Sequence, residues 1–419
     1  MYKFMKQLYP ICRSITGDGT RKTLAVIRKH LPLKIHEVKS GTRVFDWTIP
    51  QEWNIRDAYV KDGRGRKVID FKKSNLHVVN YSVPVRKKMS LKNLSGHLHT
   101  LPEYPDRIPY ITSYYNADWG FCLSARDYKK LKAGTYEVVI DSELKSGALT
   151  YGEYYLPGKS REEILLSTYI CHPSLANDNL SGIALLVNLA KILKTRKNHY
   201  SYRFLFAPET IGALAWLSGN EKNLSKIKHG LVVTCVGDKG RMTYKKTRNG
   251  TAVIDKAVEK VLRDSGDPHE ILDFFPTGSD ERQFCSPGFD LPVGSLMRTP
   301  YGKYSEYHTS ADNLNFVTEK SLADSLEKYL AVIDLLENNL TYLNLNPKGE
   351  PMLGKHGLYR KKGTPEGRNS NELARLWILN LSDGTNSLLD IALRSGLKFQ
   401  DVQTAAAELY QAKLLKSLT

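Results

Sequence analysis

Residues 162–339 show a hydrophobic pattern that switches repeatedly between the spacing of a strand and the spacing of a helix. Continuous apolar runs predict strands at residues 163–169, 202–206, 231–236 and 291–296. Apolar residues three and four positions apart predict helices at residues 181–194, 211–217, 252–263 and 318–339. Strands that alternate with helices are typical of a mostly parallel sheet in a three-layer α/β domain.

A different pattern precedes this region. Residues 1–30 are predicted to form two amphipathic helical pieces, separated by a turn at Gly17-Asp18-Gly19. Short β-type runs, broken by Pro and other turn residues, then predict a small β-rich module. The runs lie at residues 43–49, 58–60, 67–70, 77–83, 136–140 and 150–156.

The last part of the chain changes character again. Residues 348–368 are polar, basic and rich in Gly and Pro, which predicts a linker. Three helical segments follow, with turns at residues 382–384 and 395–396, in the rhythm of a winged helix. We therefore expect an α/β domain, an inserted β-rich domain, a linker and a winged-helix domain, at residues 1–45 with 131–347, 46–130, 348–368 and 369–419.

Composition narrows the class of protein. No window of the 419 residues reaches the roughly 18 uninterrupted apolar positions of a membrane span. The N-terminus lacks the apolar run and cleavage site of a signal peptide, so we expect a cytoplasmic protein. The five cysteines are widely spaced and form no CxxC pair, which favours free thiols over disulfides or a cysteine zinc finger.

The net charge of +17 would favour acidic partners such as nucleic acid, an anionic membrane surface or acidic sugars. The Lys and Arg residues are spread along the chain, however, and a solvated basic surface is the simpler interpretation.

Side chains that can bind a metal follow the predicted strands where each one ends. His172 comes after the first strand and Asp178 opens the next helix, while His308 lies in a later polar cluster. Ligands of such sheets bind beyond the carboxyl ends of the strands. A hydrolytic zinc site needs about three protein ligands and one open position. His172, Asp178 and His308 would provide it, with Glu209 after the second strand as general base.

Each of these residues also has a purely structural interpretation. A histidine at a strand end often makes only hydrogen bonds, and Asp178 could simply cap its helix. The coincidence of several metal-competent residues, in order on one α/β scaffold, favours the site.

With these residues the sequence resembles the zinc aminopeptidase family that includes bacterial leucyl and Streptomyces-type enzymes, over roughly residues 130–345. The matching elements, in order, are His172, Asp178 in Asp-Asn-Leu-Ser-Gly, Glu209 with Gly212, residues 278–284, and His308-Thr309 with Asp312. The resemblance implies a zinc-peptidase fold, zinc as cofactor, Asp178 as metal-bridging ligand and Glu209 as base.

The whole chain resembles more closely a bacterial subfamily of these proteins. The marks are Arg13-Ser14-Ile15-Thr16-Gly17, Val44-Phe45-Asp46-Trp47, residues 53–58, Trp119-Gly120-Phe121-Cys122 and Cys171-His172-Pro173-Ser174. This resemblance implies an inserted β domain, a C-terminal winged helix and a link to surface polysaccharide biosynthesis.

The sequence departs from the two-zinc pattern at two ligand positions. Thr210 stands where the family has a second Glu, and Thr234 or Cys235 stands where it has an Asp. Either one ion is bound, or Asp238, Cys235, Glu209 or Asp280 completes a site. Loss of catalysis, with or without metal binding, is the alternative.

The resemblance implies hydrolysis of an amide bond in a peptide, or removal of an aminoacyl or acyl group from an amino sugar. Candidates for the substrate pocket are Arg282, Arg298, Tyr301 and Tyr304.

A scaffold or regulatory protein is the rival hypothesis, with the winged helix contacting protein or nucleic acid. The candidate recognition helix, residues 398–411, offers the bases only Gln400, Gln403 and Gln411 and has little positive charge. We therefore expect no DNA binding, and favour docking on the protein's own body or dimerisation. A homo-oligomer is compatible with the sequence.

Overall fold

The computed structural model describes residues 1–358 and 370–418. Its internal contacts divide it into one unit of Met1–Gly250 with Glu270–Leu326, and a second of Thr251–His269 with Glu327–Thr419. Residues 359–368 of the predicted linker lie outside the described residues. The domain boundaries expected from the sequence stay a prediction.

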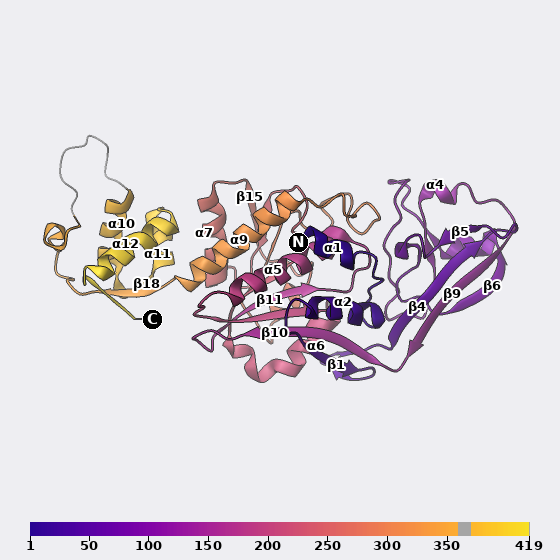
Figure 1. The fold of residues 1–419 in the computed structure, drawn as a ribbon, viewed down its shortest axis with the longest axis horizontal. Helices are drawn as coiled ribbons and strands as arrows, with labels where there is room; N and C mark the ends of the chain where they lie inside the picture. Colours follow the sequence, from indigo (N-terminus) through magenta and orange to yellow (C-terminus); the bar gives the residue numbers. More distant parts are fainter. Residues whose placement is uncertain (359–369, 419) are drawn as a thin grey trace. The chain divides into compact units, whose positions relative to one another are not determined.

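An eight-stranded mixed sheet forms the centre of the first unit (Figure 1). The order is β1 (Lys34–Lys39), β10 (Ala148–Leu156), β12 (Ser201–Ala207), β11 (Glu163–Tyr169), β13 (Ile227–Val233), β16 (Val293–Met297), β14 (Met242–Lys245) and β15 (His269–Leu272). The central strands β12, β11, β13 and β16 are parallel, whereas β1, β10 and β14 pair antiparallel. The α/β fold class is confirmed, with the parallel arrangement limited to the centre.

The centre of the sheet is closed to solvent. All residues of β11 are buried, as expected for a parallel strand that is covered on both faces. Helix α5 (Gly182–Lys194) packs on β11, β12 and β13, and α6 (Ile211–Asn220) packs on β10.

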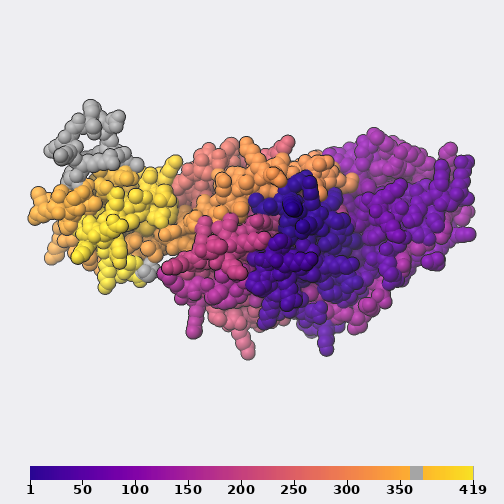
Figure 2. Space-filling model, viewed as in Figure 1, coloured from indigo at the N-terminus to yellow at the C-terminus, as the bar shows by residue number. Residues whose placement is uncertain are grey.

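The N-terminal helices belong to the same layer structure. Helix α1 (Tyr2–Leu8) packs against α5, and α2 (Asp18–Arg28) packs against β10. In Figure 2 these residues, in indigo, cover part of the visible face of the sheet region.

The β-rich part of the first unit is a four-stranded antiparallel sheet around its own apolar core. Its order is β5 (Lys67–Asp70), β4 (Glu52–Lys61), β9 (Thr135–Lys145) and β6 (Val85–Ser90). The strand expected at residues 77–83 was wrong. Tyr81 has a positive φ of 75° and Pro84 follows, so this stretch makes only isolated bridges.

Shorter elements complete the first unit. They are β2 (Arg43–Val44), β3 (Trp47–Thr48), β7 (Leu98–His99), β8 (Phe121–Cys122), α3 (Leu91–Leu94), α4 (Ala125–Tyr128) and α8 (Glu281–Phe284). Helix α9 (Glu319–Glu337) continues the chain into the second unit.

The second unit contains α7 (Val253–Ser265), α10 (Ser370–Leu381), α11 (Leu388–Ser395) and α12 (Phe399–Gln411). A three-stranded sheet accompanies them, in the order β18 (Asp383–Ser387), β17 (Thr341–Asn344), β19 (Leu415–Ser417). Because β17 precedes the predicted linker, this sheet begins before the expected boundary at residue 369.

Within this unit, helix α7 contacts α11 and α12 through two polar interactions. The Phe399 backbone N–H, at the start of α12, donates to Asp264 Oδ2 at 2.9 Å, and Lys256 Nζ lies 3.2 Å from Asp390 Oδ1. Among the helices of the described ranges, none has both the length and the apolar character to cross a membrane.

Candidate metal centre

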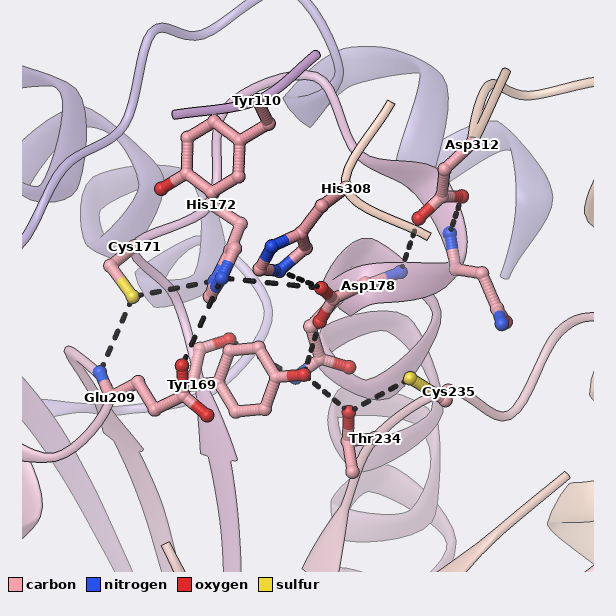
Figure 3. Close-up of polar contacts among 12 residues, drawn as sticks. Tyr110, Tyr169, Cys171, His172, Asp178, Glu209, Thr234, Cys235, His308 and Asp312 are labelled. Atoms are coloured by element: carbon pink, nitrogen blue, oxygen red, sulfur yellow. Dashed lines mark hydrogen bonds and ion pairs between the residues drawn. The ribbon is translucent and has the colours of Figure 1, made fainter. Parts of the chain in front are cut away.

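The side chains that the sequence singled out meet at the carboxyl end of the central strands (Figure 3). His172 follows β11, and Asp178 lies in the helical turn η3 (Ala176–Ser181) that leads into α5. Glu209 follows β12, and His308 reaches the same point from the loop before α9. Loops that are far apart in sequence therefore converge because parallel strands end on one edge.

Three ligand atoms define the centre. The Nε2 of His308 lies 3.0 Å from Asp178 Oδ2, and the Nε2 of His172 lies 4.0 Å from the same oxygen. Glu209 Oε2 lies 3.8 Å from His172 Nε2. Ligand atoms of His172, Asp178 and His308 all lie within 4.8 Å of one another.

Two of these atoms, Asp178 Oδ2 and His308 Nε2, are buried, and their close contact is with each other at 3.0 Å. A buried polar atom without a full set of partners costs on the order of 1–3 kcal/mol, and a bound ion is one arrangement that removes this cost. Two imidazoles and one carboxylate are a donor set that zinc prefers. The residues present therefore fit a zinc ion.

The protonation states of His172 and Asp178 also suit metal binding. Burial lowers the pKa of His172 to about 4, which keeps its imidazole neutral with a free lone pair. Burial alone would raise the pKa of Asp178, but the neighbouring His172 and His308 lower it to about 2. Neutral imidazole and ionised carboxylate are the forms that bind a metal.

Asp312 holds the turn that carries Asp178. Its carboxylate accepts hydrogen bonds from the backbone N–H groups of Asn177 at 2.6 Å and Asp178 at 2.9 Å. The Ala176 N–H donates to the Asp312 carbonyl at 2.9 Å. Since Asp312 lies on the loop of His308, one loop supplies both a ligand and the support for another.

The second oxygen of Asp178 is occupied by protein. The Tyr169 hydroxyl donates to Asp178 Oδ1 and lies 2.7 Å from Thr234 Oγ1. One face of Asp178 is therefore ready for a metal, and the other is satisfied by a phenol.

Glu209 lies beside a second carboxyl group. Burial, reinforced by the charges of Asp280 and Asp178, raises the pKa of Glu209 well above its usual range. Burial also raises the pKa of Asp280, whose Oδ1 accepts the Thr210 N–H at 2.7 Å. Asp280 thus supports the backbone next to Glu209 and is absent from the ligand groups of the described residues.

A cavity of about 310 Å³ opens beside the cluster. Among its lining residues are His172, Glu209, Arg282 and His308. Its aromatic wall consists of Trp47, Tyr110, Tyr114 and Tyr115. The Arg282 guanidinium donates to Thr210 Oγ1 at 3.1 Å.

Other candidates from the sequence point elsewhere. The Asp238 carboxylate accepts hydrogen bonds from Asn177 Nδ2 at 3.0 Å, Gly240 N–H at 2.6 Å and Thr299 Oγ1 at 2.6 Å, so it has no free oxygen for a metal. Arg298 is paired with Asp324 at 2.6 Å and does not line the cavity, and its expected substrate role stays a prediction.

Cys235 and Tyr304 contact each other away from the wall of the cavity. The Cys235 Sγ is 3.6 Å from the Tyr304 hydroxyl, and burial raises the pKa of the Cys235 thiol well above its usual range. Neither residue lines the cavity, and Cys235 is absent from the possible ligand groups of the described residues. The metal role expected for Cys235 and the substrate contact expected for Tyr304 stay predictions.

Sequence reasoning assigned no role in the site to Tyr169, Cys171 or Trp47, although Trp47 and Cys171 belong to the motifs of the subfamily resemblance. Tyr169 had been only the last residue of a strand, although its hydroxyl holds Asp178. Cys171 Sγ lies 3.5 Å from His172 Nδ1 and accepts the Glu209 N–H at 3.3 Å. Aromatic and thiol side chains in a strand normally indicate only a core.

Comparison with known proteins agrees with this architecture. A family model described as a domain of unknown function (DUF4910) matches residues 2–339, and a winged helix-turn-helix model matches residues 340–417. A Clostridium acetobutylicum protein is 60% identical over 416 residues, which cover 99% of this chain and 96% of that protein. Its provisional name is polysaccharide biosynthesis protein with aminopeptidase-like domain.

Solved structures give the same result. A crystal structure from Clostridium acetobutylicum, provisionally described as a peptidase, is 59% identical with a TM-score of 0.95, over 100% of this chain and 96% of that one. A zinc aminopeptidase from Bacillus subtilis has 12% identity and a TM-score of 0.58, over 79% of this chain and 93% of that one. The second similarity shows the fold alone.

Proposed function

This chain belongs to the DUF4910 family and carries an aminopeptidase-like domain, and we propose that it hydrolyses an amide bond with the help of a zinc ion. The observation that supports this most is the buried cluster in which Asp178 Oδ2 lies 3.0 Å from His308 Nε2 and 4.0 Å from His172 Nε2. His172, Asp178 and His308 would hold the ion.

When bound, zinc supplies Lewis-acid chemistry to a carbonyl group and to water. Glu209 contributes the proton transfers. Its side chain is 26% exposed and lines the cavity, so it can take a proton from water there and return it to the leaving nitrogen. Burial and neighbouring carboxylates raise the pKa of Glu209, which brings this base closer to neutral pH.

We propose a single ion in each chain. A second ion would need Asp178 Oδ1, which already accepts the Tyr169 hydroxyl. Thr210 stands at one of the two positions where the related two-zinc enzymes have carboxylates, and Thr234 or Cys235 stands at the other; both threonines take part only in hydrogen bonds. Neither threonine offers the anionic oxygen that would replace such a ligand.

The substrate is proposed to be a peptide or an N-acylated sugar of polysaccharide biosynthesis, the process named for the Clostridium acetobutylicum relative. A metal-binding scaffold without activity is the alternative. The cavity beside Glu209 favours the enzyme, because a scaffold has no need of one.

One experiment separates these alternatives. Zinc content by mass spectrometry is measured for the wild type and Glu209→Gln, and both are assayed on peptide and N-acyl-sugar amides. We expect about one zinc per chain in both proteins, with hydrolysis reduced by about 10²–10⁴-fold in Glu209→Gln. Absence of zinc after reconstitution would overturn the proposal, and equal activity would remove Glu209 from it.

A further inference from the structure

The cavity beside the metal centre has an unusual balance of charge. Within the set of described residues that line it, Glu209 is the one carboxylate and Arg282 is the one side chain with a permanent positive charge. Its other polar lining groups are hydroxyls, a thiol and the imidazoles of His172 and His308.

Arg282 has no close ion-pair partner. Over residues 1–358 and 370–418 no carboxylate lies within 4.0 Å of its guanidinium, which donates one hydrogen bond, to Thr210 Oγ1 at 3.1 Å, although the charge of Asp280 acts on it from farther away. The side chain is partly buried, and its Nε is buried and has no hydrogen-bond partner. Lys245 and Arg203 differ, because they pair with Glu281 at 2.8 Å and Glu163 at 2.6 Å. A ligand carboxylate is therefore the natural complement of Arg282.

The same balance of charge argues against a substrate with a free amino group. An ammonium ion that leaves water for a cavity needs a negative group beside it. Glu209 is the one carboxylate on the wall, and the proposed mechanism uses it as the base. An acylated, uncharged nitrogen makes no such demand.

The aromatic wall suggests a flat or ring-shaped group. Trp47 on β3 is 41% exposed and Tyr115 is 49% exposed, with ring centroids 5.5 Å apart. Large aromatic side chains that remain exposed at a cavity mark a binding surface. Such rings pack well against the apolar face of another ring.

We propose that this cavity selects N-acyl compounds that have no free amino group and whose leaving amine carries a carboxylate. Arg282 is the residue that binds this carboxylate. Thr210 joins Arg282 to the residue next to Glu209, so the carboxylate lies within a few bonds of the scissile amide. N-acyl amino acids and N-acylated acidic sugars share this chemistry. The inference rests on the proposed hydrolase, since the scissile amide has to lie at Glu209.

Calorimetric titration of the zinc-loaded, full-length Glu209→Gln protein tests it. The probes are N-benzoylglycine, its neutral analogue N-benzoylglycinamide, N-acetylneuraminate and leucinamide. We expect N-benzoylglycine to bind at least about tenfold more tightly than its amide, as a charge-assisted hydrogen bond predicts. Stronger binding of N-acetylneuraminate than of N-benzoylglycine would identify the acidic sugar as the source of the carboxylate, and the reverse would identify the amino acid.

Arg282→Gln in the same background should remove this preference and leave binding of the neutral amide within about twofold. Arg282→Lys should restore part of the preference, because a point charge replaces the bidentate fork. Arg126→Gln is the matched control, since Arg126 is an exposed arginine paired with Asp106 and lies outside the cavity.

Equal affinity for the acid and the amide, or tighter binding of leucinamide, would overturn the inference. This comparison uses Arg282 intact, so equal affinity overturns the inference even if Arg282→Gln fails to fold. A preference for the acid that survives in Arg282→Gln would assign the carboxylate to the zinc ion and also overturn the inference. Preference for the acid that depends on Arg282, without hydrolysis of any amide, would keep Arg282 as a carboxylate-binding residue and remove the hydrolase. Hydrolysis of leucinamide in preference to N-acyl acids would overturn the inference and leave the proposed hydrolase standing.

Discussion

The metal centre and the winged helix are both built on widely reused architectures, but their key polar atoms differ in how fully they are hydrogen-bonded. Asp178 Oδ2 and His308 Nε2 are buried and closely contact only each other, at 3.0 Å. At the start of α12, the end from which a recognition helix reads bases, the Phe399 N–H is satisfied by Asp264. Buried ligand atoms that lack a full set of hydrogen-bond partners indicate a place for an ion, whereas an N–H group that already donates to a carboxylate does not.

Removing a ligand of the metal centre should have the largest effect. His172→Ala and His308→Ala each leave two of the three donors, so zinc affinity should fall beyond the roughly 10–100-fold typical of indirect changes. Titration with a competing chelator measures it. His356→Ala, an exposed histidine in the second unit, is the control. Zinc retained at wild-type affinity in both variants would contradict the assignment.

Zinc should also stabilise the fold, because it binds the native site and not the unfolded chain. At a free concentration of about 100 times the dissociation constant, the gain is about 2.7 kcal/mol. Differential scanning calorimetry with and without chelator measures the shift in Tm. The shift should disappear in Asp178→Asn, and a shift of equal size in that variant would place the ion elsewhere.

The satisfied oxygen of Asp178 offers a smaller and more specific change. Tyr169→Phe removes the hydroxyl that caps Oδ1, and should weaken zinc binding by about 10–100-fold without changing its stoichiometry. Adding Thr210→Glu and Thr234→Asp should raise the stoichiometry from about one ion to about two. Mass spectrometry counts the ions, and two in the wild type would show that Tyr169 does not exclude the second.

The winged helix should give the smallest effect. Deleting residues 370–418 should change affinity for duplex DNA by less than about twofold, because Gln400, Gln403 and Gln411 provide no phosphate-binding charge. Fluorescence anisotropy over a range of salt concentrations measures it. Salt-dependent binding that the deletion abolishes would revive the nucleic-acid hypothesis.

The sequence predicted the parts of the fold in which burial leaves a continuous pattern. The run at residues 163–169 became β11 with the same bounds, because a strand buried on both faces is apolar throughout. The edge strand β1 was missed. Its sequence KIHEVK is mostly polar, since an edge strand faces solvent, and it pairs only with β10.

The site divides in the same way. His172, Asp178 and Glu209 could be selected because each follows a strand or opens a helix, and His308 because it lies in a polar cluster that matches the family pattern. The role of Tyr169 depends on contacts across the sheet that leave no local trace. Thr210 and His308 also have positive φ values of 60° and 53°, a conformation that sequence rules assign to glycine.

The hydrogen bonds to Asp312 join two distant loops into one structural unit. The backbone N–H groups of residues 176–178 donate three hydrogen bonds to Asp312, two to its carboxylate and one to its carbonyl oxygen, and the two loops also carry ligands of one centre. An engineer who moved only His172, Asp178 and His308 onto another α/β scaffold would leave Asp178 on an unsupported turn. The smallest graft that keeps the ligand geometry therefore includes both loops, and their lengths must be kept together.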